Sequence, residues 1–281
     1  MVEKKKKNIF LRILSFLGKC IAYPIFTILF GLIWLIGELV LHSKVVGKKY
    51  IRKDDEARVF IANHYELYGP TIFILKFPYR SIPWIMDGMM EPELIDHQIG
   101  MNVYNNYKFI PKFIKKMFMA FFKPFVLFVF HHLLHAISVS RDYPKKNIIT
   151  MKKSIAVLEK GKPLFICPEF DYHTEGGVGT FFSGFETIAK FYYKKTGKRI
   201  SFYPIYISKI NKKMYIGKPV VFNPNEDMNV EQERIVSTLH RKMERMWRVF
   251  EVNGKRYKKL KAKQEKRKLN KENKQTESKI D

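Results

Sequence analysis

Residues 200–207 read ISFYPIYI, and residues 57–63 read ARVFIAN. Both runs are short, apolar and rich in β-branched and aromatic residues, which is typical of strands. Three further runs have the same character: AISVS (136–140), PLFICPE (163–169) and KMYIGKPVVF (213–222). Five such runs spread over the chain predict a sheet at the centre of the fold.

Helical patterns alternate with these runs. NIITMKKSIAVLEKG (147–161) ends at a glycine, FETIAKFYYKKTGK (185–198) precedes the run that begins at residue 200, and residues 231–251 form an amphipathic pattern. Strands that alternate with helices predict an α/β fold with a central mixed sheet flanked by helices. We expect this domain to occupy residues 45–253.

The composition favours a membrane partner. The chain has 281 residues and a net charge of +26, of which the lysine-rich tail at 254–281 supplies +8. The rest of the chain is therefore basic as well, and such a surface attracts phosphate on lipid or nucleic acid. The 24 Phe and 15 Tyr favour a membrane interface with anionic lipids, and no nucleic-acid-binding motif is present. We expect the tail to be disordered.

Two cysteines, Cys20 and Cys167, provide no disulfide framework, which is typical of a reducing cytosol. Cys167 lies within an apolar run and has no accompanying histidine motif, so a buried thiol is favoured over a nucleophile.

The amino-terminal segment, residues 1–44, predicts a membrane anchor. Residues 20–37 form an uncharged run of 18, just long enough to cross a bilayer. Six Lys/Arg precede this run and six more follow it at 43–58, so a single span would place one basic cluster outside the cell. A monotopic hairpin that bends at Pro24 or Gly31 keeps both clusters on the cytoplasmic face of the cell membrane. The hairpin is favoured over the span.

Residues 106–135 form a second apolar and basic block, in which lysines alternate with Phe and Met. This pattern suits an element that lies on the lipid headgroup layer. His131 and His135 have a spacing that can bind zinc, but the sequence offers no third ligand nearby, so no metal site is expected.

Four stretches follow one another in a suggestive order. Residues 63–70 read NHYELYGP, AISVSRD brings Arg141 to the end of a strand, residues 167–172 read CPEFDY, and FYPIYIS carries Pro204. Together they resemble the motifs of the glycerolipid acyltransferases that acylate lysophosphatidic acid. The family patterns are Asn-His, four arbitrary residues and then Asp-Pro; a strand ending in arginine; Phe-Pro-Glu-Gly-Thr-Arg; and an apolar strand with a central proline.

The resemblance covers about residues 55–225 and implies a glycerol-3-phosphate acyltransferase-like fold. It also implies a 1-acylglycerol-3-phosphate O-acyltransferase-like reaction, with acyl-CoA or acyl-carrier protein as donor substrate and no bound cofactor. In such a site His64 takes the proton of the attacking hydroxyl, and Arg141 and Glu169 bind the acceptor.

The chain departs from the family at two points. Gly69 stands where the family has the aspartate that orients the histidine, and loss of that carboxylate costs about 10⁴ in rate in a triad. Glu66 or Asp171 is expected to replace it, although Glu66 can equally be a carboxylate that stabilises a helix start. Asp171 and Tyr172 replace the family's Thr-Arg and are assigned to the acceptor pocket.

These features predict an enzyme of phospholipid biosynthesis that transfers a fatty acyl group to a lysophospholipid-like acceptor. The alternative is a catalytically impaired relative with the same fold that binds lipid. A basic nucleic-acid-binding protein is the third and least favoured possibility.

Overall fold

The computed structural model describes residues 2–52, 57–65, 68–99, 111–141, 143–169, 177–254, 256–259, 261–263 and 266. The chain divides into two compact units. One comprises residues 1–41 and 82–154, and the other comprises residues 42–81 and 155–281. Helix α6 (Asn147–Glu159) runs from the first unit into the second.

The second unit is built on a mixed sheet with strand order β1-β7-β6-β2-β5. The bounds are β1 (Lys44–Val46), β2 (Ala57–Ala62), β5 (Leu164–Ile166), β6 (Ile200–Ser208) and β7 (Lys213–Ile216). Strands β2, β5 and β6 are parallel, β7 is antiparallel to β6, and β1 is parallel to β7. The predicted α/β fold with a central mixed sheet is therefore confirmed.

Strand β6 is the centre of this sheet, and all nine of its residues are buried. It pairs first with β8 (Val220–Val221), through Ser201 and Phe202, and then with β7 from Ile205 onward. Pro204 lies in the gap between these two pairings, where its lack of an N–H breaks no antiparallel bond. The single strand predicted at 213–222 is consequently two strands separated by residues 217–219.

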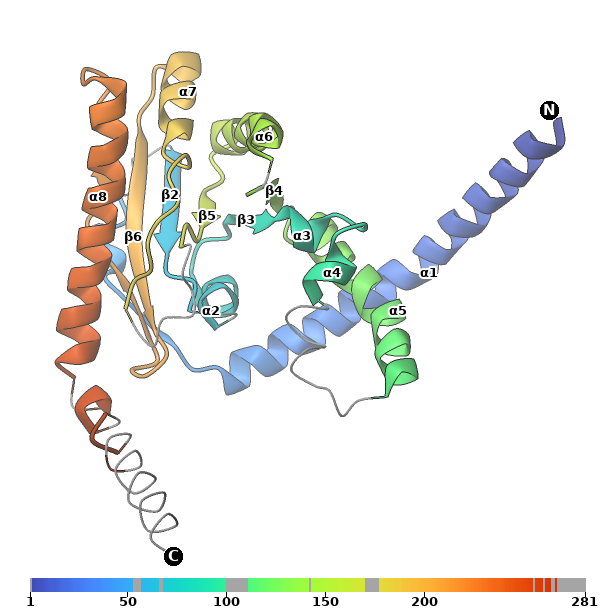
Figure 1. Cartoon of the computed structure of the whole chain (residues 1–281), viewed down its shortest axis with the longest axis horizontal. Coiled ribbons are helices and arrows are strands. Elements are labelled where there is room, and N and C mark those ends of the chain that lie inside the picture. Colours follow the sequence, from blue (N-terminus) through green and yellow to red (C-terminus); the bar gives the residue numbers. More distant parts are fainter. Residues whose placement is uncertain are drawn as a thin grey trace, which may run out of the picture. The chain divides into compact units, whose positions relative to one another are not determined.

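Helices cover both faces of this sheet. Helix α8 (Met228–Met246) runs along one side of it and α2 (Tyr68–Lys76) lies on the other (Figure 1). Phe73 of α2 stacks on Phe165 with ring centroids 3.7 Å apart, while α8 buries a stripe of apolar side chains. Helix α7 (Thr187–Thr196) also packs on β6, and a 3-10 turn, η1 (Lys48–Tyr50), follows β1. Helix α8 continues as a π-helix, η5 (Trp247–Val252).

The first unit contains the long helix α1 (Val2–Val40) and a parallel strand pair, β3 (Ile82–Met86) and β4 (Ile137–Val139). Short helices α3 (Asp87–Met90) and α4 (Ile95–Ile99) follow β3. Helix α5 (Lys112–Phe128) continues as a π-helix, η3 (Val129–Leu133), and a 3-10 turn, η4 (Pro144–Lys146), precedes α6.

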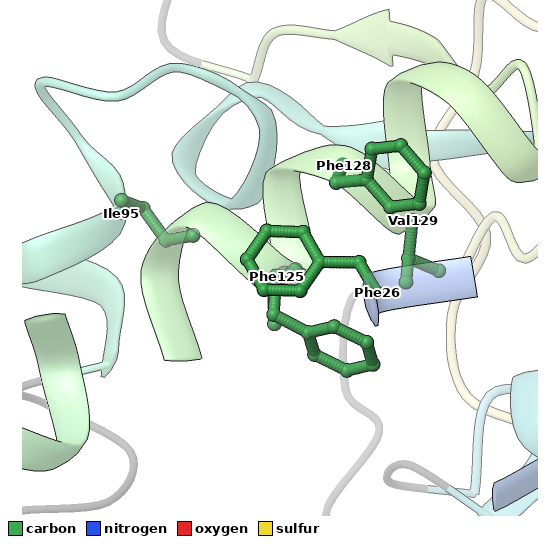
Figure 2. Close-up of a cluster of buried hydrophobic side chains, with 6 residues drawn as sticks. Phe26, Ile95, Phe125, Phe128 and Val129 are labelled. Carbon is green, nitrogen blue, oxygen red and sulfur yellow. The ribbon is translucent and has the colours of Figure 1, made fainter. Parts of the chain in front are cut away.

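Residues 2–40 form one continuous helix, α1, in place of the predicted hairpin. The helix is continuous through Pro24, and Gly31 does not have the positive φ that a reversal of the chain would favour. Its partner is α5: Phe26 of α1 packs against Phe125 and Phe128 with ring centroids 5.6 Å apart, as Figure 2 shows. Residues Gly18–Val40 are long and apolar enough to cross a membrane.

Candidate active site

His64 lies just beyond the carboxyl end of β2, which is the edge of a parallel sheet where ligands commonly bind. Asn63 fixes this end of the strand. Its side-chain oxygen accepts a hydrogen bond from the N–H of Ile207 at 2.7 Å, and its amide donates to the Ile207 carbonyl at 3.1 Å. This paired contact ties the residue before His64 to the backbone of β6.

Glu169 joins the third predicted motif to the first. Its Oε2 accepts a 2.6 Å hydrogen bond from the backbone N–H of His64, and its Oε1 accepts one of 3.0 Å from the N–H of Gly179. The Glu169 side chain is only 2% exposed. Burial raises its pKa to about 7, against the lowering effect of the two N–H donors.

These contacts give Glu169 a positioning role. Each of its carboxylate oxygens accepts a hydrogen bond from a backbone N–H, one of which belongs to His64. The expected contact of Glu169 with the acceptor stays a prediction. A buried carboxylate that ties two loops together also explains why the site needs a glutamate at this position.

The turn after His64 is tight. Tyr65 has a φ of 42°, in the left-handed region, and the N–H of Gly69 donates to the His64 carbonyl at 3.1 Å. A Cβ at position 69 would lie 2.3 Å from the His64 carbonyl oxygen and 2.5 Å from that of Asn63. Position 69 therefore excludes every side chain, including the aspartate of the family motif.

The two candidates for the missing carboxylate, Glu66 and Asp171, lie outside the described residues, as does Tyr172. They stay predictions. Arg141 follows β4 in the first unit, and its side chain is exposed to solvent.

A cation that the sequence reading did not single out lies near His64. The Lys209 ammonium is 5.6 Å from the centre of the Tyr65 ring and 5.8 Å from that of Tyr68. The sequence could have identified Lys209 as a site residue, because it directly follows a buried strand and so lies at the carboxyl edge of the sheet. Lys209 therefore supplies positive charge close to the turn that carries His64.

Two further buried groups support this edge of the sheet. The Tyr206 hydroxyl donates to Oε2 of Glu251 at 3.0 Å, which ties β6 to the π-helix η5. Burial raises the pKa of the Glu251 carboxyl above its ordinary value.

The thiol of Cys167 is also perturbed. Burial, and to a smaller extent the charge of the nearby Glu169, raises its pKa well above the ordinary value. A thiol of this kind stays protonated, in agreement with the expected inert role.

Comparisons with known proteins find a likeness among solved structures but not among families. No protein-family model matches the chain, and no curated protein matches it significantly. Among solved structures, it is similar to PlsC, the 1-acyl-sn-glycerophosphate (LPA) acyltransferase from Thermotoga maritima, with 17% identity over 76% of each chain and a TM-score of 0.44.

Proposed function

We propose that this protein is a membrane-associated acyltransferase that moves a fatty acyl group from a thioester to a lysophospholipid-like hydroxyl. The observation that carries the proposal is the hydrogen bond between the His64 backbone and Glu169. It brings together the Asn-His pair and the Pro-Glu pair, which are the two motifs that resemble the catalytic motifs of the family.

The reaction places one proton transfer on His64. The acceptor oxygen attacks the thioester carbonyl of acyl-CoA or acyl-carrier protein while His64 removes the hydroxyl proton. A C–O ester bond forms, the C–S bond breaks, and the imidazolium returns the proton to the departing thiolate. Glu169 holds the His64 backbone in place, and Glu66 or Asp171 orients the ring.

Two basic side chains and the motif at residues 167–172 bind the acceptor. Arg141 suits a phosphate because its guanidinium can donate two parallel hydrogen bonds, and Lys209 adds charge near Tyr65. Asp171 and Tyr172 would then contact the polar part of the headgroup.

We also propose that the first unit attaches the protein to the cytoplasmic face of the cell membrane. Helix α1 supplies a 23-residue apolar stretch. Helix α5 presents Phe113 and Met117, which are 71% and 68% exposed, beside the lysines at 115 and 116. A helix with exposed apolar groups and lysines fits the boundary between acyl chains and anionic headgroups.

The test is acyl transfer by the full-length protein in liposomes, with labelled acyl-CoA or acyl-carrier protein and a panel of lyso-lipids. We expect His64→Ala to reduce the rate by about 10² to 10⁴. The matched control is His97→Ala, an exposed histidine of α4, which should keep full activity. Transfer that is equal in both variants would refute His64 as the base.

A second candidate function is favoured by Gly69. Because no carboxylate can stand at that position, a protein that binds lipid without acylating it is also consistent with the site. Retained binding of lyso-lipid with no transfer from either donor would establish this alternative.

A further inference from the structure

A second polar site lies in the sheet-containing unit, on the same edge of the sheet as His64. It is a cavity of about 590 Å³, within the range of small-molecule pockets. Four elements of the unit contribute to it: the start of β1, the end of α2, the turn between β6 and β7, and the segment after η5. The lining residues are His42, Ser43, Lys44, Lys76, Asn211, Lys212, Lys213 and Arg256.

The cavity is strongly cationic. Five of its eight lining residues are Lys or Arg, and no Asp or Glu is among them in the described part of the chain. Like charges gathered around one space repel one another, and the repulsion is relieved when an anion enters. Lys76 and Lys213 are half-buried, so their interactions are less screened by solvent than those of fully exposed lysines.

The wall of the cavity is fixed by the backbone. The N–H of Lys44 donates to the Lys212 carbonyl at 3.0 Å, and Lys44 pairs with Lys213 at the start of the parallel β1–β7 ladder. The Asn211 amide is held by the Phe250 carbonyl at 2.8 Å. The hydroxyl oxygen of Ser43 is buried and makes no hydrogen bond within the described residues.

The cavity is distinct from the site at His64. Neither His64 nor any other residue assigned to the candidate active site is among the residues that line it. His42 follows the last residue of α1 by only two positions, which limits its distance from the end of that apolar helix to about 7 Å.

We propose that this cavity binds a phosphate-bearing anion. Lysine and arginine side chains around a shared space are suited to the oxygens of a phosphate monoester or diphosphate. The same chemistry is found on an anionic lipid headgroup, which the short link to α1 favours, and on a soluble phosphate compound. The site does not depend on acyl transfer and can exist in a protein that lacks it.

The experiment compares two variants of the full-length protein that lose equal charge. Lys76→Ala/Lys213→Ala removes two cavity lysines, and the control, Lys160→Ala/Lys194→Ala, removes two exposed lysines outside the cavity lining. One arm titrates inorganic pyrophosphate into detergent-solubilised protein by calorimetry. The other measures the ratio of binding to phosphatidylcholine vesicles with and without phosphatidic acid, which isolates the headgroup from insertion of α1.

We expect the cavity variant to lose about tenfold in affinity for one of these probes, since each lysine near an acidic surface contributes to the binding free energy. Loss confined to the vesicle ratio identifies a lipid headgroup, and loss for pyrophosphate identifies a soluble phosphate. Lys76→Arg/Lys213→Arg should restore binding and would exclude a folding defect. Equal behaviour of the cavity and control variants towards both probes would overturn the proposal.

Discussion

The carbonyl oxygen of His64 lies 2.3 Å from the place where a Cβ on residue 69 would stand. The glycine at this position is therefore required by the turn that carries the candidate base. The aspartate of the family motif has no room here, and a catalytic histidine in this chain must be oriented from elsewhere.

Gly69→Asp should consequently fail to raise acyl transfer and should destabilise the fold. Backbone atoms cannot move aside as a flexible side chain can, so we expect a loss of at least about 1–3 kcal/mol in the free energy of unfolding. Chemical denaturation of Gly69→Ala and Gly69→Asp measures this loss. Gly31→Ala is the control, because nothing lies within 4 Å of its Cβ position, and it should be neutral or slightly stabilising. Higher activity in Gly69→Asp would contradict the geometry.

The buried carboxyl of Glu169 should make the stability of the folded protein depend on pH. Its pKa rises from 4.5 to about 7 on folding, so the folded protein binds this proton more tightly than the unfolded chain does. The stability that the proton provides is complete below about pH 4.5 and is lost as the pH rises through about 7. Relative to Glu169→Gln, the wild type should lose about 3 kcal/mol of unfolding free energy across that window.

The informative measurement is the slope of the unfolding free energy against pH. The absolute stability is less informative, because Glu169→Gln also loses one backbone hydrogen bond at every pH. Glu233→Gln, on the exposed face of α8, serves as control and should follow the wild-type slope. Parallel curves for wild type and Glu169→Gln would show that the carboxyl titrates normally.

The exposed face of α5 gives a prediction for membrane binding. Phe113→Glu/Met117→Glu should weaken flotation with vesicles of anionic lipid by at least about tenfold, because two apolar anchors become anions. Ile148→Glu/Ile149→Glu makes the same charge change at two exposed isoleucines of α6 in the same unit. If both variants float alike, α5 has no special role at the membrane surface.

Cys167 should be unreactive in the folded protein. Burial raises its pKa well above the ordinary value, which keeps the thiol protonated near neutral pH. A maleimide reagent applied to the detergent-solubilised Cys20→Ser variant should therefore label Cys167 only on unfolding. Mass spectrometry of Cys20→Ser and Cys167→Ser separates the two sites, and rapid labelling of Cys167 in the folded protein would be the opposite result.

Local sequence patterns were sufficient for the strands at the centre of the sheet. The runs at 57–63 and 200–207 became β2 and β6 because their apolar, β-branched composition suits only a buried strand. The break between β7 and β8 was missed, since the apolar residues continue on both sides of Gly217 and Pro219. The signal was the proline itself, which cannot donate to the sheet.

Contacts between distant segments were beyond the reach of the sequence. Nothing near Phe26 indicates that its partners are Phe125 and Phe128, so a turn within the first 44 residues was the simpler hypothesis. The crowding at Gly69 likewise comes from the backbone carbonyls of Asn63 and His64, whose position no residue pattern records. The proximity of His64 and Glu169 was expected from the family resemblance alone.

The pairing of α1 with α5 has a consequence for biosynthesis. About a hundred residues separate Phe26 from Phe125, and at about 5–20 residues per second the ribosome needs roughly 5–20 seconds to complete the second helix after the first. During that interval the apolar helix has emerged without its partner. In a newly made chain the apolar surface around Phe26 therefore stays uncovered by α5 until the second helix has been synthesised.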